Sequence, residues 1–136
     1  MISKVHFSSA RGNWKTPKAL YEELDKEFHF DCDPCLVTEG TIHDRDMLGS
    51  TWGKRNYVNP PYGKALPEWV AKAWLERERG HLVVMLIPSR TDTRWWHDYI
   101  MKADEIRFIK GRLKFDDGKN PAPFPSAIII FKPSTN

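Results

Sequence analysis

The strongest constraint on the fold is the run Leu82–Ile87, in which six apolar residues follow one another without a polar interruption. An element with one solvated face would place polar residues within such a run. A short, unbroken run is therefore typical of a strand that is covered on both faces. Strands of this kind occur mostly in parallel sheets flanked by helices, so the run predicts an α/β architecture.

Helical and strand patterns alternate along the rest of the chain. Thr16-Pro17 predicts the start of a helix, with Thr16 as the N-cap and Pro17 at the first helical position. Pro67 and Gly80 mark the start and the end of another helix. The other predicted elements are strands over Phe28–Cys32, Arg55–Val58 and Ala127–Phe131, a helix over Asp92–Ala103, and a bent strand or hairpin around Gly111.

This order of elements implies crossover connections and a mostly parallel sheet. Residues 36–54 are too few for two full strand–helix units, so we expect the sheet to be trimmed. A chain of 136 residues fits one domain. We predict a flexible, polar N-terminal arm over residues 1–13 and a single folded domain over residues 14–136.

Composition narrows the classes of function. No run approaches the roughly 18 apolar residues of a membrane helix, and residues 1–11 lack the apolar stretch of a signal peptide. We therefore expect a cytoplasmic protein with no membrane association. The 21 basic and 18 acidic residues leave a net charge of only +3, which is a weak indication of nucleic-acid binding. Six tryptophans are a stronger one, because those outside the core can form a stacking surface.

Cys32 and Cys35 form a C-x-x-C pair, which is typical of half a zinc site or of a redox centre. No second pair and no H-x-x-x-H accompanies them, and structural zinc needs four ligands. No helix is predicted directly after Cys35, which disfavours a thioredoxin-type disulfide. We interpret both cysteines as small, reduced side chains and predict no metal site.

Three polar or proline-rich turns directly follow predicted strands: Asp33-Pro34, Asn59–Tyr62 and Pro88–Arg90. In open α/β sheets, ligands bind at the carboxyl ends of the strands. We therefore expect these turns to line one edge of the sheet and to form the functional site.

The turn Asn59-Pro60-Pro61-Tyr62 carries the most chemical information. Its two prolines fix two φ angles, so the Asn59 amide oxygen and the Pro60 carbonyl oxygen are held in preset directions. Two fixed acceptors can grip both N–H bonds of a planar –NH2 group and leave the nitrogen lone pair free to attack an electrophile. Tyr62 adds a ring on which a heterocycle can stack, and a base in this position must first leave its duplex. We expect these four residues to be catalytic.

A methyl sulfonium cofactor is the electrophile that such a site calls for. Its ribose hydroxyls or cationic amino acid end need an acidic partner, for which Asp33, beside Pro34, and Asp31 are the candidates. Thr16-Pro17 predicts helix N–H groups that face the cofactor carboxylate. Asp46 is predicted to accept a hydrogen bond from the adenine amine of the cofactor.

Six segments in a fixed order carry a family resemblance: Trp14–Pro17, Phe30–Cys35, Asp46–Leu48, Tyr57–Gly63, Leu86–Thr93 and Ile109–Phe115. Over residues 14–131 the chain resembles the phage-type DNA adenine-N6 methyltransferase family. The resemblance implies a Rossmann-like fold, S-adenosyl-L-methionine as methyl donor and the N6 amine of adenine in double-stranded DNA as target. It also implies that Asn59–Tyr62 is the catalytic turn and that Thr16, Pro17 and Asp33 lie at the cofactor.

The chain departs from broader methyltransferases at the end of its first predicted strand. Asp33-Pro34-Cys35 stands where a glycine-rich F-x-G-x-G is usual. No separate target-recognition domain is visible either, so we expect a weak sequence preference. By the same resemblance we predict a monomer that acts in the cytoplasm of a bacterial host.

DNA contacts are predicted on two segments. Arg90 precedes the Asp92–Ala103 helix, and Trp95, beside Arg94, lies off the apolar stripe of that helix. All three residues are expected to face DNA. Arg112 and Lys114, beside Gly111, are expected to bind phosphates, which gives a steep salt dependence. Trp95 would stack on a flipped base or fill its gap, although packing on a neighbouring loop is an equal alternative.

Other acceptors and another class of protein remain open at this stage. An RNA base, cytosine N4 and a protein glutamine side chain also offer a planar –NH2 group to Asn-Pro-Pro-Tyr. A non-catalytic DNA-binding module would account for the basic charge and the aromatic residues, but it gives no reason for Asn59–Tyr62 at a strand end.

Overall fold

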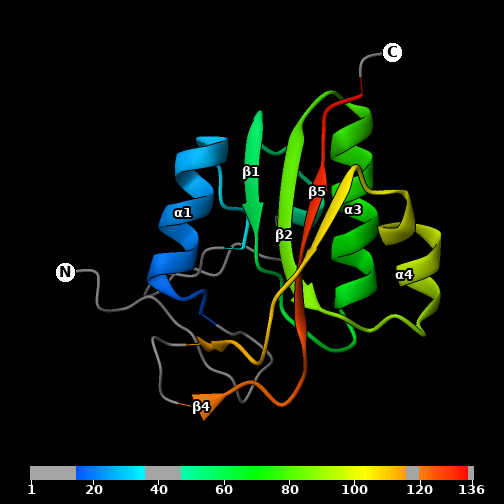
Figure 1. Ribbon diagram of the computed structural model, residues 1–136. Coiled ribbons are helices and arrows are strands. Elements are labelled where there is room, and N and C mark those ends of the chain that lie inside the picture. Colours follow the sequence, from blue (N-terminus) through cyan, green and yellow to red (C-terminus); the bar gives the residue numbers. More distant parts are fainter. Residues whose placement is uncertain (1–14, 36–46, 116–119, 135–136) are drawn as a thin grey trace.

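A computed structural model describes residues 15–35, 47–115 and 120–134, which form three layers (Figure 1). The middle layer is one open sheet in the strand order β1-β2-β5-β3. Its strands are β1 (Arg55–Val58), β2 (Leu82–Pro88), β5 (Ser126–Phe131) and β3 (Glu105–Phe108). Every residue of β2 is buried, which confirms that the Leu82–Ile87 run is a strand covered on both faces.

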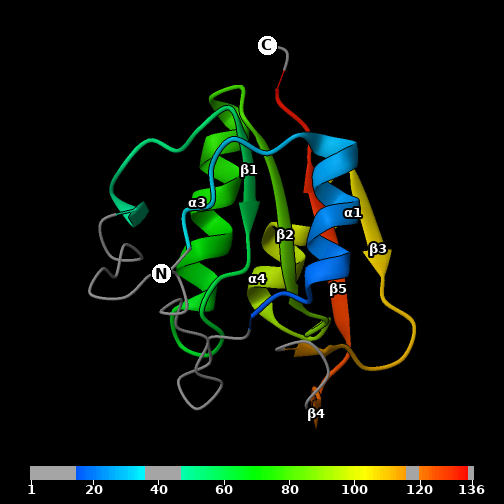
Figure 2. The same ribbon diagram turned by 90° about the vertical axis from the view of Figure 1, so that its left-hand side faces the viewer.

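Helices cover both faces of this sheet. Helix α1 (Lys18–Phe28) lies on one face, while α3 (Leu66–Glu78) and α4 (Arg94–Asp98) lie on the other (Figures 1 and 2). Because strand side chains alternate between faces, β2 and β5 contribute to two separate cores. Leu24 and Phe28 pack in the core under α1, and Trp69 and Val70 pack in the core under α3.

The sheet is mixed, so the prediction of a mostly parallel sheet is wrong. Strands β1 and β2 are parallel, but β5 runs antiparallel to both of its neighbours, β2 and β3. The physical reason lies in the connection from β3 to β5. Parallel neighbours need a crossover, usually a helix, whereas antiparallel ones do not. Among the described residues between β3 and β5, Gly111 lies in a left-handed turn (φ 73°), and Asn120–Pro121 form the short strand β4.

The predicted strand Phe28–Cys32 is also wrong, except at its last residue. Phe28 ends α1, and His29 follows in the left-handed conformation (φ 54°). Only Cys32 forms a bridge, in parallel with Asn56 of β1. The alternation in the sequence reflects two aromatic rings that pack from different elements, since Phe28 and Phe30 lie 6.1 Å apart between ring centres.

Two helix predictions need smaller corrections. Helix α1 begins at Lys18 with Pro17 in the N-cap position, so Thr16 does not cap it. The helix predicted over Asp92–Ala103 is divided into α4 and the 3₁₀ turn η2 (Ile100–Lys102), with Thr93 accepting a hydrogen bond from the Trp96 N–H at 3.2 Å. Within the described ranges, none of the helices is long and apolar enough to cross a membrane.

A buried carboxylate on α3 joins the segment before β1 to the turn before β2. Glu76 is fully buried, and its oxygens accept hydrogen bonds from Lys72 at 2.6 Å and Arg79 at 2.9 Å. The Trp52 N–H donates to it at 3.2 Å, and the His81 ring nitrogen lies 2.7 Å away. Burial alone would raise the pKa of Glu76, but the bonds from Lys72, His81 and Trp52 outweigh burial and lower it.

Replacing this carboxylate should destabilise the fold. Glu76→Gln keeps the shape of the side chain but leaves Lys72 without its counter-charge, so we expect the free energy of unfolding in urea to fall by about 3 kcal/mol at pH 7. The lowered pKa means that the stabilisation exists above the ordinary glutamate value of 4.5 and disappears as the pH falls through the lower folded-state value. The difference between the two proteins should therefore shrink in acid. Glu78→Gln, on the partly exposed side of the same helix, is the control, and an equal loss in both variants would contradict the role of Glu76.

Candidate active site

The three polar turns meet at one edge of the sheet, as the sequence predicts. Cys32 bridges β1 in parallel, and β1 pairs with β2 in parallel. Asp33, Asn59 and Ser89 therefore follow neighbouring carboxyl ends, at the lower edge in Figure 1. The Ser89 N–H donates to the Pro125 carbonyl oxygen at 2.9 Å, which holds the third turn against the start of β5.

The Asn59 carboxamide is held at both of its ends. Its Nδ2 donates to Thr16 Oγ1 at 3.1 Å, and its Oδ1 accepts from the Tyr62 hydroxyl at 2.8 Å. An amide oxygen has two lone pairs, so Oδ1 is able to accept more than one hydrogen bond. Asn59 is partly exposed, whereas Pro60 beside it is buried. The turn thus presents a carboxamide of fixed orientation at the edge of the sheet.

Tyr62 reaches into the sheet at the point where β1 has ended. Its hydroxyl also lies 3.1 Å from the Leu86 carbonyl oxygen, which is one residue beyond the last β1 pairing partner of β2. Burial of this hydroxyl raises the pKa of Tyr62 well above its ordinary value. The residue as a whole is only partly buried. Phe115 and Phe124 contact that ring edge-on, at 6.4 and 5.5 Å between centres.

Tyr57 lies at the centre of the site, although no pattern in the sequence indicates a role for it. Its hydroxyl lies 2.6 Å from Thr16 Oγ1, and only 1% of its surface is exposed. Burial raises its pKa, and the bond to Thr16 only partly opposes this effect. Its ring packs against those of Tyr21 and Phe30, at 5.1 and 5.4 Å. A tyrosine in a mostly buried strand resembles an ordinary core residue. Only the tertiary contact with Thr16 indicates that Tyr57 belongs to the site.

Asp33 is a half-buried acid of the site. Burial raises its pKa from 3.8 to about 7, against a smaller lowering by the Cys35 backbone N–H. Its charge raises the pKa of Tyr57 and of Tyr21. Pro34 is buried beside it.

The other predicted acids differ from Asp33. Asp31 is exposed, and its Oδ1 accepts a hydrogen bond from the Arg55 N–H at 3.1 Å, which ties it to the start of β1. Asp46 lies outside the described residues, as does the predicted arm over residues 1–13.

The beginning of α1 faces the same site through Thr16. No side chain caps this helix, no acidic residue lies in its first turn, and the Tyr21 N–H donates to the Pro17 carbonyl oxygen at 3.0 Å. The N–H groups that precede Tyr21 in the helix point towards its N-terminal end, where a helix favours negative charge. Thr16 contacts both Tyr57 and Asn59, so the beginning of α1 lies at this site.

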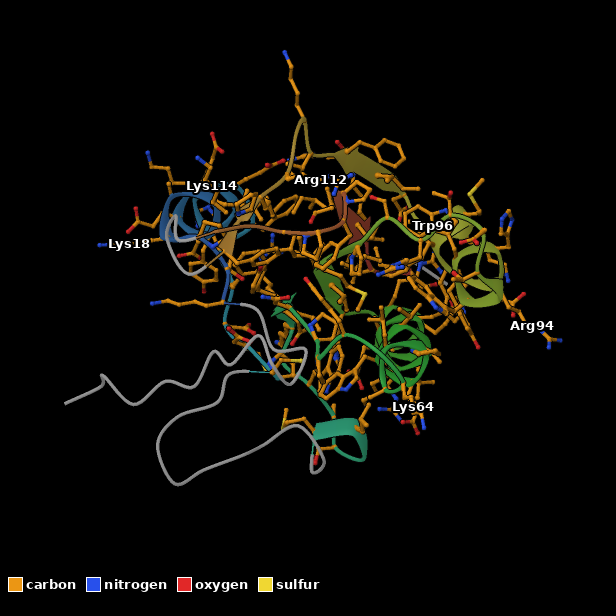
Figure 3. All side chains as sticks on the ribbon, turned by 90° about the horizontal axis from the view of Figure 1, so that it is seen from below. Lys18, Lys64, Arg94, Trp96, Arg112 and Lys114 are labelled. Atoms are coloured by element: carbon orange, nitrogen blue, oxygen red, sulfur yellow. The ribbon has the colours of Figure 1, made fainter. Side chains whose placement is uncertain are left out.

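The predicted DNA-binding cations surround this edge without forming a single cluster (Figure 3). Arg94 is almost fully exposed at the start of α4, 3.8 Å from Asp98. Arg112 and Lys114 are exposed on the segment after β3. Arg90 is exposed as well, and its guanidinium group lies 5.9 Å from the centre of the Phe124 ring. That ring contacts Tyr62, the last residue of Asn59–Tyr62.

Trp95 is neither fully exposed nor fully packed. It is partly buried against the core under α3, with its ring centre 6.0 Å from that of Trp96. Trp96 is the buried member of the pair, as its place on the apolar stripe predicts. The exposed part of Trp95 leaves a role in stacking open.

Two further lysines on this edge are missing from the sequence prediction. Lys64 lies two residues after Tyr62 and is exposed, and Lys18 is exposed at the first position of α1, 3.9 Å from Glu22 (Figure 3). Their position next to Asn59–Tyr62 and Thr16-Pro17 in the sequence is the signal that identifies them.

The cysteine pair does not form a disulfide, since Cys32 and Cys35 are both free thiols. In the part of the chain that the structure describes, no three His, Cys, Asp or Glu side chains gather into a metal site. Burial raises the pKa of the Cys32 thiol, which favours the uncharged form.

Comparison with known proteins identifies the family. A model of the DNA N-6-adenine-methyltransferase (Dam) family matches residues 4–134, which is nearly the whole chain. The chain belongs to the DNA N-6-adenine-methyltransferase family. This membership confirms the resemblance that the six segments carry in the sequence.

Two phage members of this family are similar to the chain. The DNA N-6-adenine-methyltransferase of Escherichia phage T1 is 29% identical over 125 residues, covering 84% of this chain and 52% of that protein. The enzyme of the same name from Haemophilus phage HP1 is 24% identical over 135 residues, covering 88% of this chain and 78% of that protein. The chain thus spans about half of the first relative and more of the second. No solved structure matches it significantly.

The raised pKa of Asp33 predicts how stability depends on pH. The folded protein binds this proton more tightly than the unfolded chain, so the stabilisation is complete below pH 3.8 and is lost as the pH rises towards about 7. Asp33→Asn mimics the neutral acid. We expect the variant to melt several degrees above the wild type at pH 8 and at the same temperature near pH 4, measured by thermal unfolding. Asp31→Asn, on the exposed neighbour, is the control, and a pH-independent effect of Asp33→Asn would contradict the prediction.

Proposed function

We propose that this chain is a DNA N6-adenine methyltransferase that transfers a methyl group from S-adenosyl-L-methionine to the exocyclic amine of a flipped adenine. The observation that supports the proposal most strongly is the oriented Asn59 carboxamide. The turn that carries it lies within the residues that the family model matches. The named activity of the two phage relatives agrees with it.

The residues of the turn divide the work of holding the amine. Asn59 Oδ1 and the Pro60 carbonyl oxygen are the two acceptors. Together they would bind both N–H groups and direct the nitrogen lone pair away from the turn. The Tyr62 ring would stack on the base. Because a neutral carboxamide does not take up a proton at physiological pH, Asn59 acts by orientation and not as a base.

The buried end of the site suits the methyl donor. S-Adenosyl-L-methionine supplies an electrophilic methyl group when it is bound. The uncapped N-terminus of α1, which Thr16 and Pro17 precede, would bind its carboxylate, as helix N-termini bind anions. Asp33 would accept hydrogen bonds from its hydroxyl groups or pair with its ammonium group. The chemistry of these donors and acceptors fits the group. Pro17 and Pro34 would shape this end of the site, and Asp31 and Asp46 remain secondary candidates.

The finer fold and assembly are part of the same proposal. A parallel β1–α3–β2 unit with its functional turns at the carboxyl edge supports a trimmed Rossmann-like domain, in which an antiparallel β5 replaces further parallel strands. We propose that this domain covers residues 14–136, with residues 1–13 as an arm, and that the protein acts as a monomer.

Double-stranded DNA would approach the edge that carries Asn59. Arg90, Arg94, Arg112 and Lys114 would neutralise phosphates, with Lys18 and Lys64 closest to the catalytic turn in the sequence. The exposed part of Trp95 would support the duplex where a base has left it. No interaction in this set reads a base edge, which agrees with a weak sequence preference.

The decisive experiment is transfer of labelled methyl groups from S-adenosyl-L-methionine to unmethylated double-stranded DNA, followed by digestion to nucleosides. We expect N6-methyl-2′-deoxyadenosine from the wild type and a loss of at least about a hundredfold for Asn59→Ala, because an acceptor of the transition state is removed. Label in a cytosine product, in RNA or in a protein glutamine would instead identify one of the other planar amines as the acceptor. A wild type that leaves DNA unlabelled and shows no thermal shift with the cofactor would indicate a non-catalytic DNA-binding module.

The proposed DNA edge predicts a change in salt dependence. Replacing both Arg112 and Lys114 by alanine should lower the slope of log affinity against log salt concentration by about 2, since each phosphate contact contributes about one unit. The affinity can be measured by fluorescence anisotropy on a labelled duplex. Lys26→Ala is the matched control, because Lys26 is exposed near the other end of α1, and equal slopes for the double variant and the wild type would remove these two residues from the edge.

A further inference from the structure

We propose that Tyr57 is a positioning residue for methyl transfer: its buried hydroxyl holds Thr16, and Thr16 holds the Asn59 carboxamide with its oxygen towards the acceptor amine. The inference rests on the proposed function and assigns a role to a core residue that does not itself touch the substrate. Its geometrical basis is the continuous chain from Tyr57 Oη to Thr16 Oγ1 at 2.6 Å and from Thr16 Oγ1 to Asn59 Nδ2 at 3.1 Å.

The orientation of Asn59 matters because its carboxamide has two unlike ends. With Oδ1 towards the base, the side chain accepts a hydrogen bond from the amine. A half-turn of the amide would place Nδ2 there, so that two donor groups would face each other and the amine would be repelled. The two orientations have almost the same shape, and packing alone therefore cannot select one of them. The hydrogen-bond partners at each end must make the choice.

Thr16 is the partner that selects the orientation. The Tyr62 hydroxyl has one proton and two acceptors within reach, Asn59 Oδ1 at 2.8 Å and the Leu86 carbonyl oxygen at 3.1 Å. A hydroxyl that can also accept hydrogen bonds does not by itself discriminate between Oδ1 and Nδ2. Thr16 Oγ1 is a hydroxyl too, but its second contact, with Tyr57, determines which of its sites remain for Asn59.

Tyr57 is suited to fixing Thr16. Its ring is immobilised between Tyr21 and Phe30, and its hydroxyl is shielded from water. A buried hydroxyl loses free energy without a partner, and the contact between its oxygen and Thr16 is the hydrogen bond that the structure records for it. When Thr16 donates its one hydrogen to Tyr57 Oη, Thr16 Oγ1 keeps only lone pairs and can bind the carboxamide only through Asn59 Nδ2. Tyr57 thereby sets the orientation of Asn59 without touching it.

The test is Tyr57→Phe, which removes one oxygen atom and keeps the ring. We expect kcat for methyl transfer to fall about tenfold or more, with KM for DNA and the dissociation constant of S-adenosyl-L-methionine changed less than about threefold. A purely structural role would lower the melting temperature without separating kcat from KM in this way.

Tyr21→Phe is the matched control. Its ring lies 5.1 Å from that of Tyr57 in the same cluster, and its hydroxyl is not part of the Tyr57–Thr16–Asn59 chain. We expect kcat of Tyr21→Phe within about twofold of the wild type. Thr16→Ser should keep most of the activity because it keeps the hydroxyl, while Thr16→Val, of similar shape, should lose as much as Tyr57→Phe.

A second measurement does not depend on activity. The Asn59 side-chain amide can be observed by 15N–1H NMR and assigned by its absence in Asn59→Asp. We expect Tyr57→Phe to shift these signals and to accelerate their exchange with water, and Tyr21→Phe to leave them in place. Unmoved signals in Tyr57→Phe, or a kcat within twofold of the wild type, would overturn the proposal.

The two measurements also separate this inference from the proposed function. If the wild type does not methylate DNA, the proposed function fails, and the NMR result alone decides whether Tyr57 orients Asn59. If the wild type methylates adenine and Tyr57→Phe does so equally well, only the positioning role fails.

Discussion

The arrangement of this protein depends on the buried Glu76 carboxylate. A charge in the interior is costly unless hydrogen bonds and opposite charges surround it, and Glu76 collects both. Its partners come from three places: α3 itself, the Trp52 amide just before β1, and His81 just before β2. Lys72 extends the connection to the Ser50 carbonyl oxygen at 2.5 Å. Since β1 and β2 both begin at this cluster, it fixes the start of the parallel pair whose other end carries the candidate active site.

At that other end, the Tyr57 hydroxyl group connects the core to the candidate active site. The Tyr57 ring belongs to the core under α1, but its hydroxyl meets Thr16 at the edge of the sheet. Asp33 lies close enough to affect the same group. Thr16, which is predicted to lie at the cofactor, thus joins the residue predicted to bind the amine to one buried tyrosine. In physical terms, the core and the site are not separate parts of this small domain.

The neutrality of Asn59, the first residue of the turn Asn59–Tyr62, also affects how the proposed site would act. An asparagine carries no charge, so its interaction with an amine depends on direction more than on electrostatic attraction. Direction must then come from neighbours, and Thr16 and Tyr62 supply it from opposite ends of the carboxamide. The two prolines restrict the backbone of the turn, while these two hydroxyl groups restrict its side chain. Rigidity of both kinds is what a site that acts by orientation requires.

The sequence alone determined the features that depend on local patterns. The apolar run became the central strand β2, the helices at Thr16-Pro17 and Pro67 formed near their predicted starts, and the motif order identified the family. The three turns at strand ends also met at one edge, because parallel strands align their carboxyl ends.

Tertiary structure decided what no local pattern encodes. The direction of β5 is set by its antiparallel pairing with both β2 and β3, so the sheet is mixed although the order of elements suggested otherwise. The strand predicted over Phe28–Cys32 shrank to one bridge, because α1 continues to Phe28 and His29 reverses the chain. Thr16 does not cap α1 as predicted. It forms hydrogen bonds with Tyr57 and Asn59, which lie 41 and 43 positions away in the sequence. Contacts over such separations form only when the chain is folded, which is why the sequence named the ends of the site but not the tyrosine that joins them.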